Sequence, residues 1–571
     1  MGLNRFSSLA GTLMIYAMVL SQSWWSCHGC LDEERSALLR IHSSFNYSSG
    51  TFLQPWGKVA DCCSWEGVDY NFTTGRVVEL YLPGKREEGL GDLYLNVSLF
   101  RPFQELQHLD LRGNFIVGCV ENEGFERLSG LDSLVFLDLG ENKFDNSVLS
   151  SLGGLSSLKS LDIAYNQLKG SFNVTELDAL INLERVNLAG NEIDKFVLSE
   201  DTRGFGNVSF ISLSNSTSNG RALPFTLLES LMKFPYFRTL SLAKNNLEGS
   251  FGTTLDKDLA SLASLKNLEE LDLSLSTVDN SFLQTVRKIT TLKSLRLNGC
   301  RLNGSIPKAQ GLFQLKHLQN LDISGNDLSG ALPWCLENLT SLQGLYLSSN
   351  NFIGDISFSP LTSLISIRDL SLSDNHFQIP ISLSSFLNHS QLKYFVGSNN
   401  QIYVEELEEH NLAPKFQLEH LYLSGNGYGG AFSFPKFLLH QYSLQDIDFS
   451  NLKLRGGFPI WLLENNTNLY ELHLVNNSLS GTFQLPIHPH QNLSELDISN
   501  NNFESHIPRE IVSYFPSLTF LSMSYNHFSG RVPSSFDFLL YLQVLDLSNN
   551  NISGTLPSFF NSSDLMHVYL S

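Results

Sequence analysis

The sequence predicts an α/β solenoid: a superhelix of stacked repeats with a ladder of parallel strands on its concave face and a helical amino-terminal cap. The first observation behind this prediction is the phrase LxxLxLxxN, which recurs from residue 106 at intervals of 23 to 31 residues, mostly 24 to 26. The second is composition, because 42% of the residues are hydrophobic and only 16% are charged. One repeat cannot bury its apolar face alone, so neighbouring repeats must stack into a continuous core.

Residues 1–29 are predicted to be a secretory signal peptide, cleaved between residues 23 and 30. The apolar run LAGTLMIYAMVL (9–20) follows Arg5 and precedes small residues, which is the order of such a signal. Its length is below the roughly 20 residues that a membrane-spanning helix needs, so an anchor is not expected here. A buried helix of a cytosolic domain is the less favoured alternative. Beyond residue 20 no apolar run is long enough to span a membrane.

Residues 30–75 are expected to form a cap over the open end of the solenoid. Asp32 is suited to cap a helix whose first turn holds Glu33 and Glu34, since acidic groups are favourable near a helix amino terminus. Leu38, Ile41 and Phe45 then form an apolar stripe on one face of that helix. The stripe would cover the first repeat.

Residues 76–571 are predicted to form about nineteen repeats and a partial one, beginning with the weak copy VVELYL (77–82). In each repeat the leucines of LxL alternate with polar residues, as in a short strand with one buried face. The asparagine that follows can satisfy backbone groups of its own and the next repeat, because its amide both donates and accepts hydrogen bonds. This predicted structural ladder consists of Asn114, Asn142, Asn166, Asn191, Asn245, Asn326, Asn350, Asn375, Asn400, Asn426, Asn477, Asn501, Asn526 and Asn550.

Small polar residues replace the ladder asparagine at Ser216, Ser276 and Cys300. Several repeats continue with L-x-G-x-[IL]-P, as in LSGALP (328–333). Glycine permits a positive φ there, and proline begins an extended stretch toward the convex side.

Fourteen Asn-x-Ser/Thr sequons support an extracellular destination, because so many on a chain with a signal peptide favour a glycosylated surface. The predicted N-glycosylation sites are Asn46, Asn71, Asn96, Asn173, Asn207, Asn215, Asn303, Asn338, Asn388, Asn465, Asn476, Asn492, Asn551 and Asn561. The formal net charge of −20 argues against a nucleic-acid partner, which would require a basic surface.

The repeats resemble the plant-specific leucine-rich repeat, whose consensus is LxxLxLxxNxLxGxIP. The segments CLDEERSALLRIHSSF (30–45) and DCCSWEGV (61–68) are similar to the plant amino-terminal cap, so the resemblance covers residues 30–571. The number of repeats, the segment GCVENEGFERL (118–128) and the loose early spacing look most like kinase-less receptor-like proteins. That resemblance implies a ligand-recognition ectodomain, signalling through partner or co-receptor kinases in plant defence or development. Its ligand would be an extracellular peptide, glycan or protein.

The cap cysteines carry one departure from this family. Cys30 and Cys62 are expected to form a disulfide that holds the cap helix in an oxidising compartment. The family usually has a further cysteine where this chain has Tyr70, so Cys63 is expected to lack its usual partner.

The concave face is the default binding surface of a solenoid. Aspartate fills the central position of many repeats, which is the repeat consensus, so residues that depart from it are more informative. Aromatic and arginine side chains are frequent binding hot spots. The ligand-binding candidates are therefore Arg296, Tyr346, Arg368, Tyr394, His420, Tyr422, Tyr470 and His473.

No catalytic grouping, cofactor or metal site is expected. The chain lacks the lysine-strand, HRD and DFG motifs of a protein kinase. His488 and His490 in IHPHQ are weak indications of a metal, since two histidines flanking a proline in a loop are common without one.

The final residues LMHVYLS (565–571) read as the beginning of a twentieth repeat. We therefore expect a full-length parent to continue into further repeats, a carboxyl-terminal cap and a transmembrane segment at the plasma membrane. A chain ending at Ser571 would instead be secreted to the apoplast. The alternative function is a secreted inhibitor or decoy similar to polygalacturonase inhibitors, but the repeat number favours the receptor.

Overall fold

The computed structural model describes residues 31–45, 56–57, 59, 61–84, 86, 88–199, 205–217, 220–231, 233–234, 236–248, 267–307, 311–405, 413–427, 430, 432–554 and 565–570. The predicted signal peptide, Cys30 and the sequons Asn46 and Asn561 lie outside these residues. The chain divides into two compact units, Met1–Asn246 and Leu247–Ser571.

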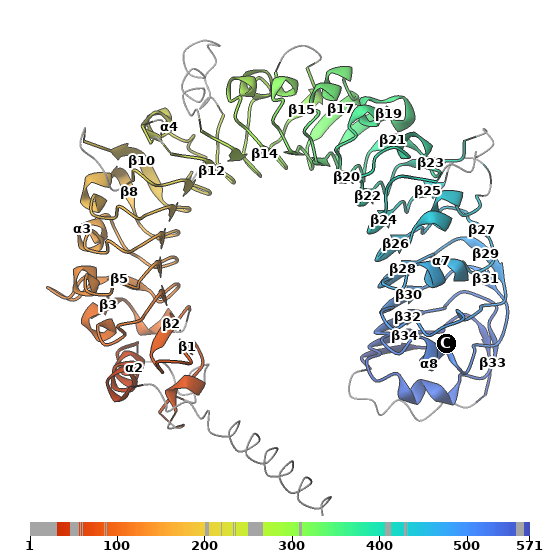
Figure 1. The fold of residues 1–571 in the computed structure, drawn as a ribbon, viewed down its shortest axis with the longest axis horizontal. Coiled ribbons are helices and arrows are strands. Elements are labelled where there is room, and N and C mark those ends of the chain that lie inside the picture. The colour runs from red at the N-terminus through yellow and green to blue at the C-terminus, as the bar shows by residue number, and fades with distance from the viewer. Residues whose placement is uncertain are drawn as a thin grey trace, which may run out of the picture. The chain divides into compact units, whose positions relative to one another are not determined.

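A ladder of short strands, one from each repeat, runs through each unit and is called the long ladder here (Figure 1). In the first unit it consists of β1 (Val68–Tyr70), β2 (Val77–Tyr81), β4 (His108–Asp110), β6 (Phe136–Asp138), β7 (Ser160–Asp162), β9 (Arg185–Asn187), β11 (Phe210–Ser212) and β12 (Thr239–Ser241). In the second it consists of β13 (Glu270–Asp272), β14 (Ser294–Arg296), β16 (Asn320–Asp322), β18 (Gly344–Tyr346), β20 (Asp369–Ser371), β22 (Tyr394–Val396), β24 (His420–Tyr422), β26 (Asp446–Asp448), β28 (Glu471–His473), β30 (Glu495–Asp497), β32 (Phe520–Ser522), β34 (Val544–Asp546) and β36 (His567–Tyr569).

The strands of the long ladder pair in parallel and in register, so the middle residue of each strand faces the middle residue of the next. Leu109 is paired with Leu137, and Leu321 with Leu345. These leucines are at most 1% exposed, whereas most of the residues flanking them are half-buried or exposed. The only antiparallel pairing among the described strands of this ladder joins β1 to β2. The predicted solenoid with a parallel strand ladder is confirmed.

The asparagine that follows each strand joins its repeat to the preceding repeat through side-chain hydrogen bonds. Asn142 donates from Nδ2 to the carbonyls of Leu139 and Leu111, both at 3.0 Å, and accepts at Oδ1 from the N–H groups of Asn114 and Ile116. Every ladder asparagine with a described side chain donates to its own and the preceding repeat. The expected direction, toward the next repeat, is therefore wrong, because the free carbonyls and N–H groups lie on the preceding bend. The side chain of Asn426 is outside the described residues.

A second set of short strands follows the asparagine and was not anticipated from the sequence. These strands pair in parallel within five groups. They are β3 (Leu93–Leu95) with β5 (Ile116–Cys119); β8 (Lys169–Asn173) with β10 (Glu192–Val197); β15 (Asn303–Ser305), β17 (Asp327–Ala331), β19 (Asn351–Asp355), β21 (His376–Pro380), β23 (Gln401–Tyr403) and β25 (Asn426–Gly427); β27 (Arg455–Gly456), β29 (Ser478–Gly481) and β31 (Asn502–Phe503); and β33 (Ser529–Gly530) with β35 (Asn551–Ile552). Gly330 in LSGALP has a φ of 84°, so the positive φ expected at this glycine is present.

Short helices complete the repeats on the side away from the long ladder (Figure 1). The α-helices after the cap are α3 (Val148–Leu152), α4 (Phe225–Leu231), α6 (Phe282–Thr285), α7 (Ile460–Asn465) and α8 (Ile511–Tyr514). The 3-10 helices are η1 (Cys62–Ser64), η2 (Glu88–Leu90), η3 (Val97–Phe100), η4 (Phe125–Leu128), η5 (Val174–Leu177), η6 (Val286–Lys288), η7 (Leu312–Gln314), η8 (Trp334–Asn338), η9 (Ile356–Phe358), η10 (Pro360–Ser363), η11 (Ser384–Phe386), η12 (Lys436–His440) and η13 (Ser534–Phe538).

The cap helix α2 (Asp32–Phe45) covers the beginning of the first unit. Leu38, Ile41 and Phe45 are fully buried, as their spacing predicts. The helix already includes Asp32, so the assignment of Asp32 as the capping residue is wrong by one position. Glu34 is also buried, and its Oε2 accepts a hydrogen bond from the N–H of Val77 at 3.1 Å.

Cys62 is disulfide-bonded.

Within the described part of the chain, no helix combines the length and apolarity needed to cross a membrane.

Candidate functional site

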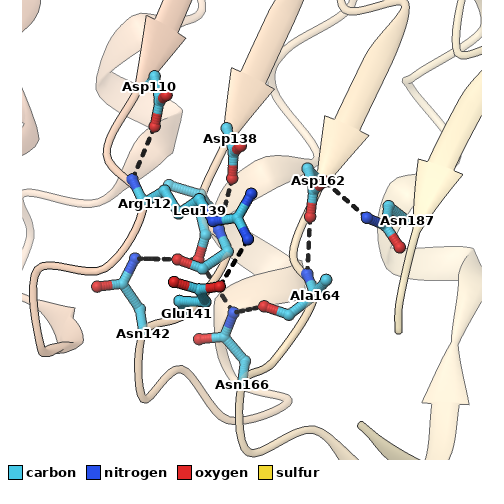
Figure 2. A network of polar contacts seen from close by, with 11 residues as sticks. Asp110, Arg112, Asp138, Leu139, Glu141, Asn142, Asp162, Ala164, Asn166 and Asn187 are labelled. Carbon is cyan, nitrogen blue, oxygen red and sulfur yellow. Dashed lines mark hydrogen bonds and ion pairs between the residues drawn. The ribbon is translucent and has the colours of Figure 1, made fainter. Parts of the chain in front are cut away.

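The aspartate column of the long ladder has a structural role in its own repeats. Each aspartate accepts at Oδ1 a hydrogen bond from the backbone N–H two residues later, which holds the bend after the strand. The eight residues that do this are Asp110, Asp138, Asp162, Asp272, Asp322, Asp448, Asp497 and Asp546. Figure 2 shows the first three, in neighbouring strands of the first unit. This local bond explains why aspartate is the consensus and why it carries little information about a ligand.

One of these aspartates is unusual in its protonation. Asp138 is 7% exposed, and burial, together with the neighbouring carboxylate of Asp162, raises the pKa of Asp138 to about 7. Burial also raises the pKa of Asp110. Asp162 has a partner in Asn187, whose Nδ2 donates to Asp162 Oδ2 at 2.7 Å (Figure 2). Asp138 is thus the aspartate of this column whose pKa is raised to near neutral pH.

The eight ligand-binding candidates all lie in the second unit, on or directly before strands of the long ladder. Tyr394 and His420 occupy the first position of β22 and β24, which are paired in register. Tyr422 and His473 occupy the third position of β24 and β28. Arg368 and Tyr470 directly precede β20 and β28 and are exposed.

Four side chains from consecutive repeats form a continuous row, which we call the aromatic row: Arg368, Tyr394, His420 and Asp446. The guanidinium of Arg368 lies 5.6 Å from the ring centroid of Tyr394. The rings of Tyr394 and His420 are stacked, with centroids 4.5 Å apart and an interplanar angle of 12°. His420 then contacts the carboxylate of Asp446. The structure therefore brings three of the candidates together, and Asp446 ends the row.

Tyr346 and Tyr422 border the aromatic row. Tyr346 donates to Asp369 at 3.5 Å, and the carboxylate of Asp369 lies 3.9 Å from Arg368. Burial first, and then the carboxylate of Asp446, raises the pKa of Tyr422, so its phenol stays protonated and can donate a hydrogen bond.

A charged pair lies beside the aromatic row. Lys393, directly before β22, donates to Glu419, directly before β24. This bond lowers the pKa of Glu419. The pair holds both charges at the surface next to Tyr394 and His420.

Tyr470 and His473 lie on the next repeat and face acidic groups. Tyr470 is 47% exposed and borders an open hollow of about 730 Å³, which Asp446, Glu471 and Ser494 also line. His473 lies 3.9 Å from Glu471 and 3.7 Å from Glu495. The surface thus changes from aromatic with paired charges, between Arg368 and Glu419, to mainly acidic at Glu471 and Glu495.

Arg296 is not part of this arrangement. It is exposed on β14, and its register partners are Asp272 and Asp322. Strand β16 separates it from Tyr346 on β18.

Sequence reasoning missed several residues that shape the aromatic row. Asp446 ends it, Asp369 orients Tyr346 and Arg368, and Gly344 leaves room for the ring of Tyr346, because an added Cβ would lie 3.1 Å from that ring. All three stand at the first position of their strands, in the column of Tyr394 and His420. Comparing that column repeat by repeat would have found them.

The remaining features noted in the sequence are His490 of the IHPHQ segment and the predicted glycosylation sites. His490 is buried, with Nε2 2.9 Å from the carbonyl of Asn466 and Nδ1 accepting from Leu493 N–H. Its ring nitrogens are therefore occupied by the backbone. The sequon asparagines among the described residues are all half-buried or exposed, and Asn492 borders the hollow beside Tyr470.

Family comparisons place leucine-rich repeats along the chain. The family described as "Leucine rich repeat N-terminal domain" matches residues 31–69. "Leucine Rich repeats (2 copies)" matches residues 316–363, and "Leucine Rich Repeat" matches residues 492–513, 517–539 and 541–563.

Curated relatives match most of the chain. Cuscuta receptor 1 of Solanum lycopersicum is 31% identical over 87% of this chain and 51% of its own length. Receptor-like protein 1 of Arabidopsis thaliana is 34% identical over 91% of this chain and 50% of its own length. The chain thus spans about half the length of these relatives, whose names describe a receptor and a receptor-like protein.

A solved structure supports the fold. The plant peptide hormone receptor RGFR1, in complex with RGF2, matches with a TM-score of 0.50 and 24% identity, over 89% of this chain and 95% of that chain. Similarity at this identity concerns the fold alone.

Proposed function

This chain belongs to the plant leucine-rich repeat receptor-like proteins, and we propose that it is a ligand-recognition ectodomain that binds through the aromatic row. The observation that carries the proposal is the continuous contact from Arg368 through Tyr394 and His420 to Asp446. Stacked aromatic and guanidinium groups held half-exposed on a rigid strand ladder are well suited to binding, since little side-chain entropy remains to be lost.

The charge order along this face favours a peptide or protein segment over a neutral glycan. Arg368 and Lys393 lie at one end, each beside one carboxylate, Asp369 or Glu419. Asp446, Glu471 and Glu495 lie at the other end. Successive strands of a sheet are about 4.8 Å apart, so these charges are spread over a length that an extended peptide can follow. A peptide with an acidic group near Arg368 and a basic group near Glu471 would complement both ends.

The receptor context follows from the family. We propose that the protein acts at the cell surface, where it would pass the signal of ligand binding to a partner or co-receptor kinase in defence or development. The relatives named as receptors support this role.

The test is peptide selection on the purified chain. A phage-displayed random peptide library is selected on the immobilised wild type and on the double variant Tyr394→Ala/His420→Ala. We expect the wild type to enrich peptides that carry both acidic and basic residues, and the double variant to bind the enriched peptides at least about tenfold more weakly, as loss of a hot spot predicts. The matched control is Tyr94→Ala, which removes an exposed tyrosine on β3, outside the long ladder, and should leave binding unchanged.

Two results would contradict the proposal. Equal binding by the double variant would exclude the aromatic row as the ligand site. Inhibition of a polygalacturonase by the purified chain, without any peptide binding, would favour the secreted inhibitor instead.

A further inference from the structure

Three metal-ligating side chains converge on the long ladder, beyond the end of the aromatic row. Glu471 and His473 are two residues apart on β28, so both point to the same face of the ladder. Glu495 on β30 is the register partner of Glu471. One donor atom from each of the three residues lies within 4.8 Å of the other two.

The distances between these donor atoms are close to those of a metal site. His473 Nε2 lies 3.7 Å from Glu495 Oε2 and 3.9 Å from Glu471 Oε2. Donor atoms that bind one tetrahedral Zn²⁺ at about 2.0–2.2 Å lie roughly 3.3–3.6 Å from one another. His473 Nε2 is therefore only a few tenths of an ångström beyond this range from either carboxylate, and the donor oxygens of the two glutamates lie within 4.8 Å of each other.

In this cluster two carboxylates on neighbouring strands lie near a single histidine. The groups that act on Glu471 are the carboxylates of Asp446 and Glu495 and the imidazoles of His473 and His420. Among the described residues, the ion pairs of both glutamates go to His473 alone. Like charges directly opposite each other on neighbouring strands are destabilising, and a bound divalent cation would reverse that repulsion.

The donor set also indicates the class of ion. One imidazole nitrogen with two carboxylate oxygens suits Zn²⁺ and the neighbouring divalent transition metals, whereas Mg²⁺ and Ca²⁺ prefer oxygen donors throughout. The side chains of Glu471, His473 and Glu495 are between 25% and 35% exposed, so an ion can reach them from solvent. Three protein ligands on an open surface would leave one position for water or for a donor from a bound ligand.

We propose that Glu471, His473 and Glu495 form a binding site for one divalent transition-metal ion, with Zn²⁺ as the fitting example. The site uses one strand for two ligands and the next strand for the third. Metal binding at these residues does not require the receptor function proposed above, so either can fail without the other.

The experiment is a calorimetric titration of ZnCl₂ into the full chain, purified without a polyhistidine tag and treated with a chelator. The wild type should bind one Zn²⁺ that is lost or weakened at least about tenfold in His473→Gln and in Glu495→Gln, since removal even of groups that only orient metal ligands costs 10-fold to 100-fold in affinity. Both glutamine variants keep the size and polarity of half-exposed side chains, and circular dichroism will verify that they fold.

The matched control is His376→Gln, which removes an exposed histidine on β21, outside the long ladder, and should leave Zn²⁺ affinity unchanged. Absence of Zn²⁺ binding by the folded wild type would overturn the proposal. Equal affinity in wild type and His473→Gln, or a larger loss in His376→Gln than in His473→Gln, would overturn it as well.

Discussion

At the scale of single residues, this protein depends on side chains that form hydrogen bonds with backbone groups left unpaired at the bends. Each bend leaves carbonyl and N–H groups that no strand can satisfy, and a buried unsatisfied polar group costs roughly 1–3 kcal/mol. Asparagine supplies donors and an acceptor at once, as Asn142 does, and Asp138 accepts at the adjacent bend. For substitutions in the asparagine column and in the aspartate column, the sign of the change in the free energy of unfolding can therefore be predicted.

Cys300 occupies a ladder position with a poorer hydrogen-bonding group. Its Sγ donates to the carbonyl of Leu273 in the preceding repeat, at 3.0 Å, but it has no amide to serve the remaining groups. We expect Cys300→Asn to raise the free energy of unfolding by about 1 kcal/mol, the usual net value of a buried hydrogen bond. Thermal melting followed by circular dichroism measures the change. Cys300→Ala is the control and should lower the melting temperature; a lower melting temperature for the asparagine variant would contradict the prediction.

Asp138 should make the first unit sensitive to pH. Its pKa is raised to about 7 in the folded state, so the folded state binds the proton more tightly and stability falls as the pH rises from about 4 to 7. Asp138→Asn keeps the acceptor for Gly140 N–H and removes the charge. The variant should match the wild type near pH 4 and exceed it above pH 7, by at most about 4 kcal/mol at 1.4 kcal/mol per pKa unit.

Melting temperatures at pH 4 and pH 8 measure this difference. Asp138→Ala separates charge from hydrogen bonding, because it also loses the acceptor and should gain less than the asparagine variant at pH 8. A stability advantage of Asp138→Asn that is the same at both pH values would contradict the role of the carboxylate charge.

At the scale of elements, the joint between the cap helix α2 and strand β2 depends on Glu34. Its carboxylate accepts from Val77 N–H on β2 and lies 3.6 Å from the guanidinium of Arg76. Burial raises the pKa of Glu34, while the Val77 bond opposes that rise. The cap is therefore held by one buried carboxylate in addition to its apolar stripe.

We expect Glu34→Ala to lower the free energy of opening the cap by about 2 kcal/mol, because the N–H of Val77 is left buried without a hydrogen-bond acceptor. Hydrogen exchange at the amides of β2 should then become roughly 30-fold faster, since 1.4 kcal/mol corresponds to a factor of ten. Glu33→Ala, on the exposed side of the same helix, is the control and should change little. Unchanged exchange in Glu34→Ala would show that the hydrogen bond from Val77 to Glu34 does not hold the cap.

At the scale of the whole molecule, each repeat contacts its neighbours, so a perturbation should stay local. Asn350 donates to Leu347 in its own repeat and to Ile323 in the preceding one. Solenoid stability is close to a sum of repeat terms and nearest-neighbour terms. A lost ladder asparagine should therefore weaken a few repeats rather than the entire chain.

Asn350→Ala tests this locality by hydrogen exchange resolved along the chain. We expect faster exchange in the strands of the neighbouring repeats, β16, β18 and β20, and unchanged exchange in the first unit. Asn351→Ala is the control, because its side chain is exposed and bonds only to exposed Asp327 among the described residues. Acceleration of exchange in β2 or β4 would mean that the chain unfolds as one cooperative body.

The sequence by itself determined the architecture and the position of the long ladder, because both depend on a local periodicity that recurs in every repeat. The family was indicated by a resemblance of the repeat consensus and the cap segments. The leucines of each strand and the asparagine after it are placed by spacing alone. The second set of strands was missed, since those segments are short and carry no regular alternation. The buried role of Glu34 was missed because it depends on a backbone group 43 residues later.

Only the tertiary structure decided which side chains meet across repeats. Tyr394 and His420 are 26 residues apart in sequence, yet register stacks their rings, while Arg296 has the same kind of side chain as Arg368 and remains apart. The cluster of Glu471, His473 and Glu495 likewise arises from pairing of β28 with β30. The physical reason is that the spacing between repeats varies along the sequence. Which side chains of neighbouring repeats meet therefore depends on the strand register that packing selects, and the sequence of a single repeat does not encode that register.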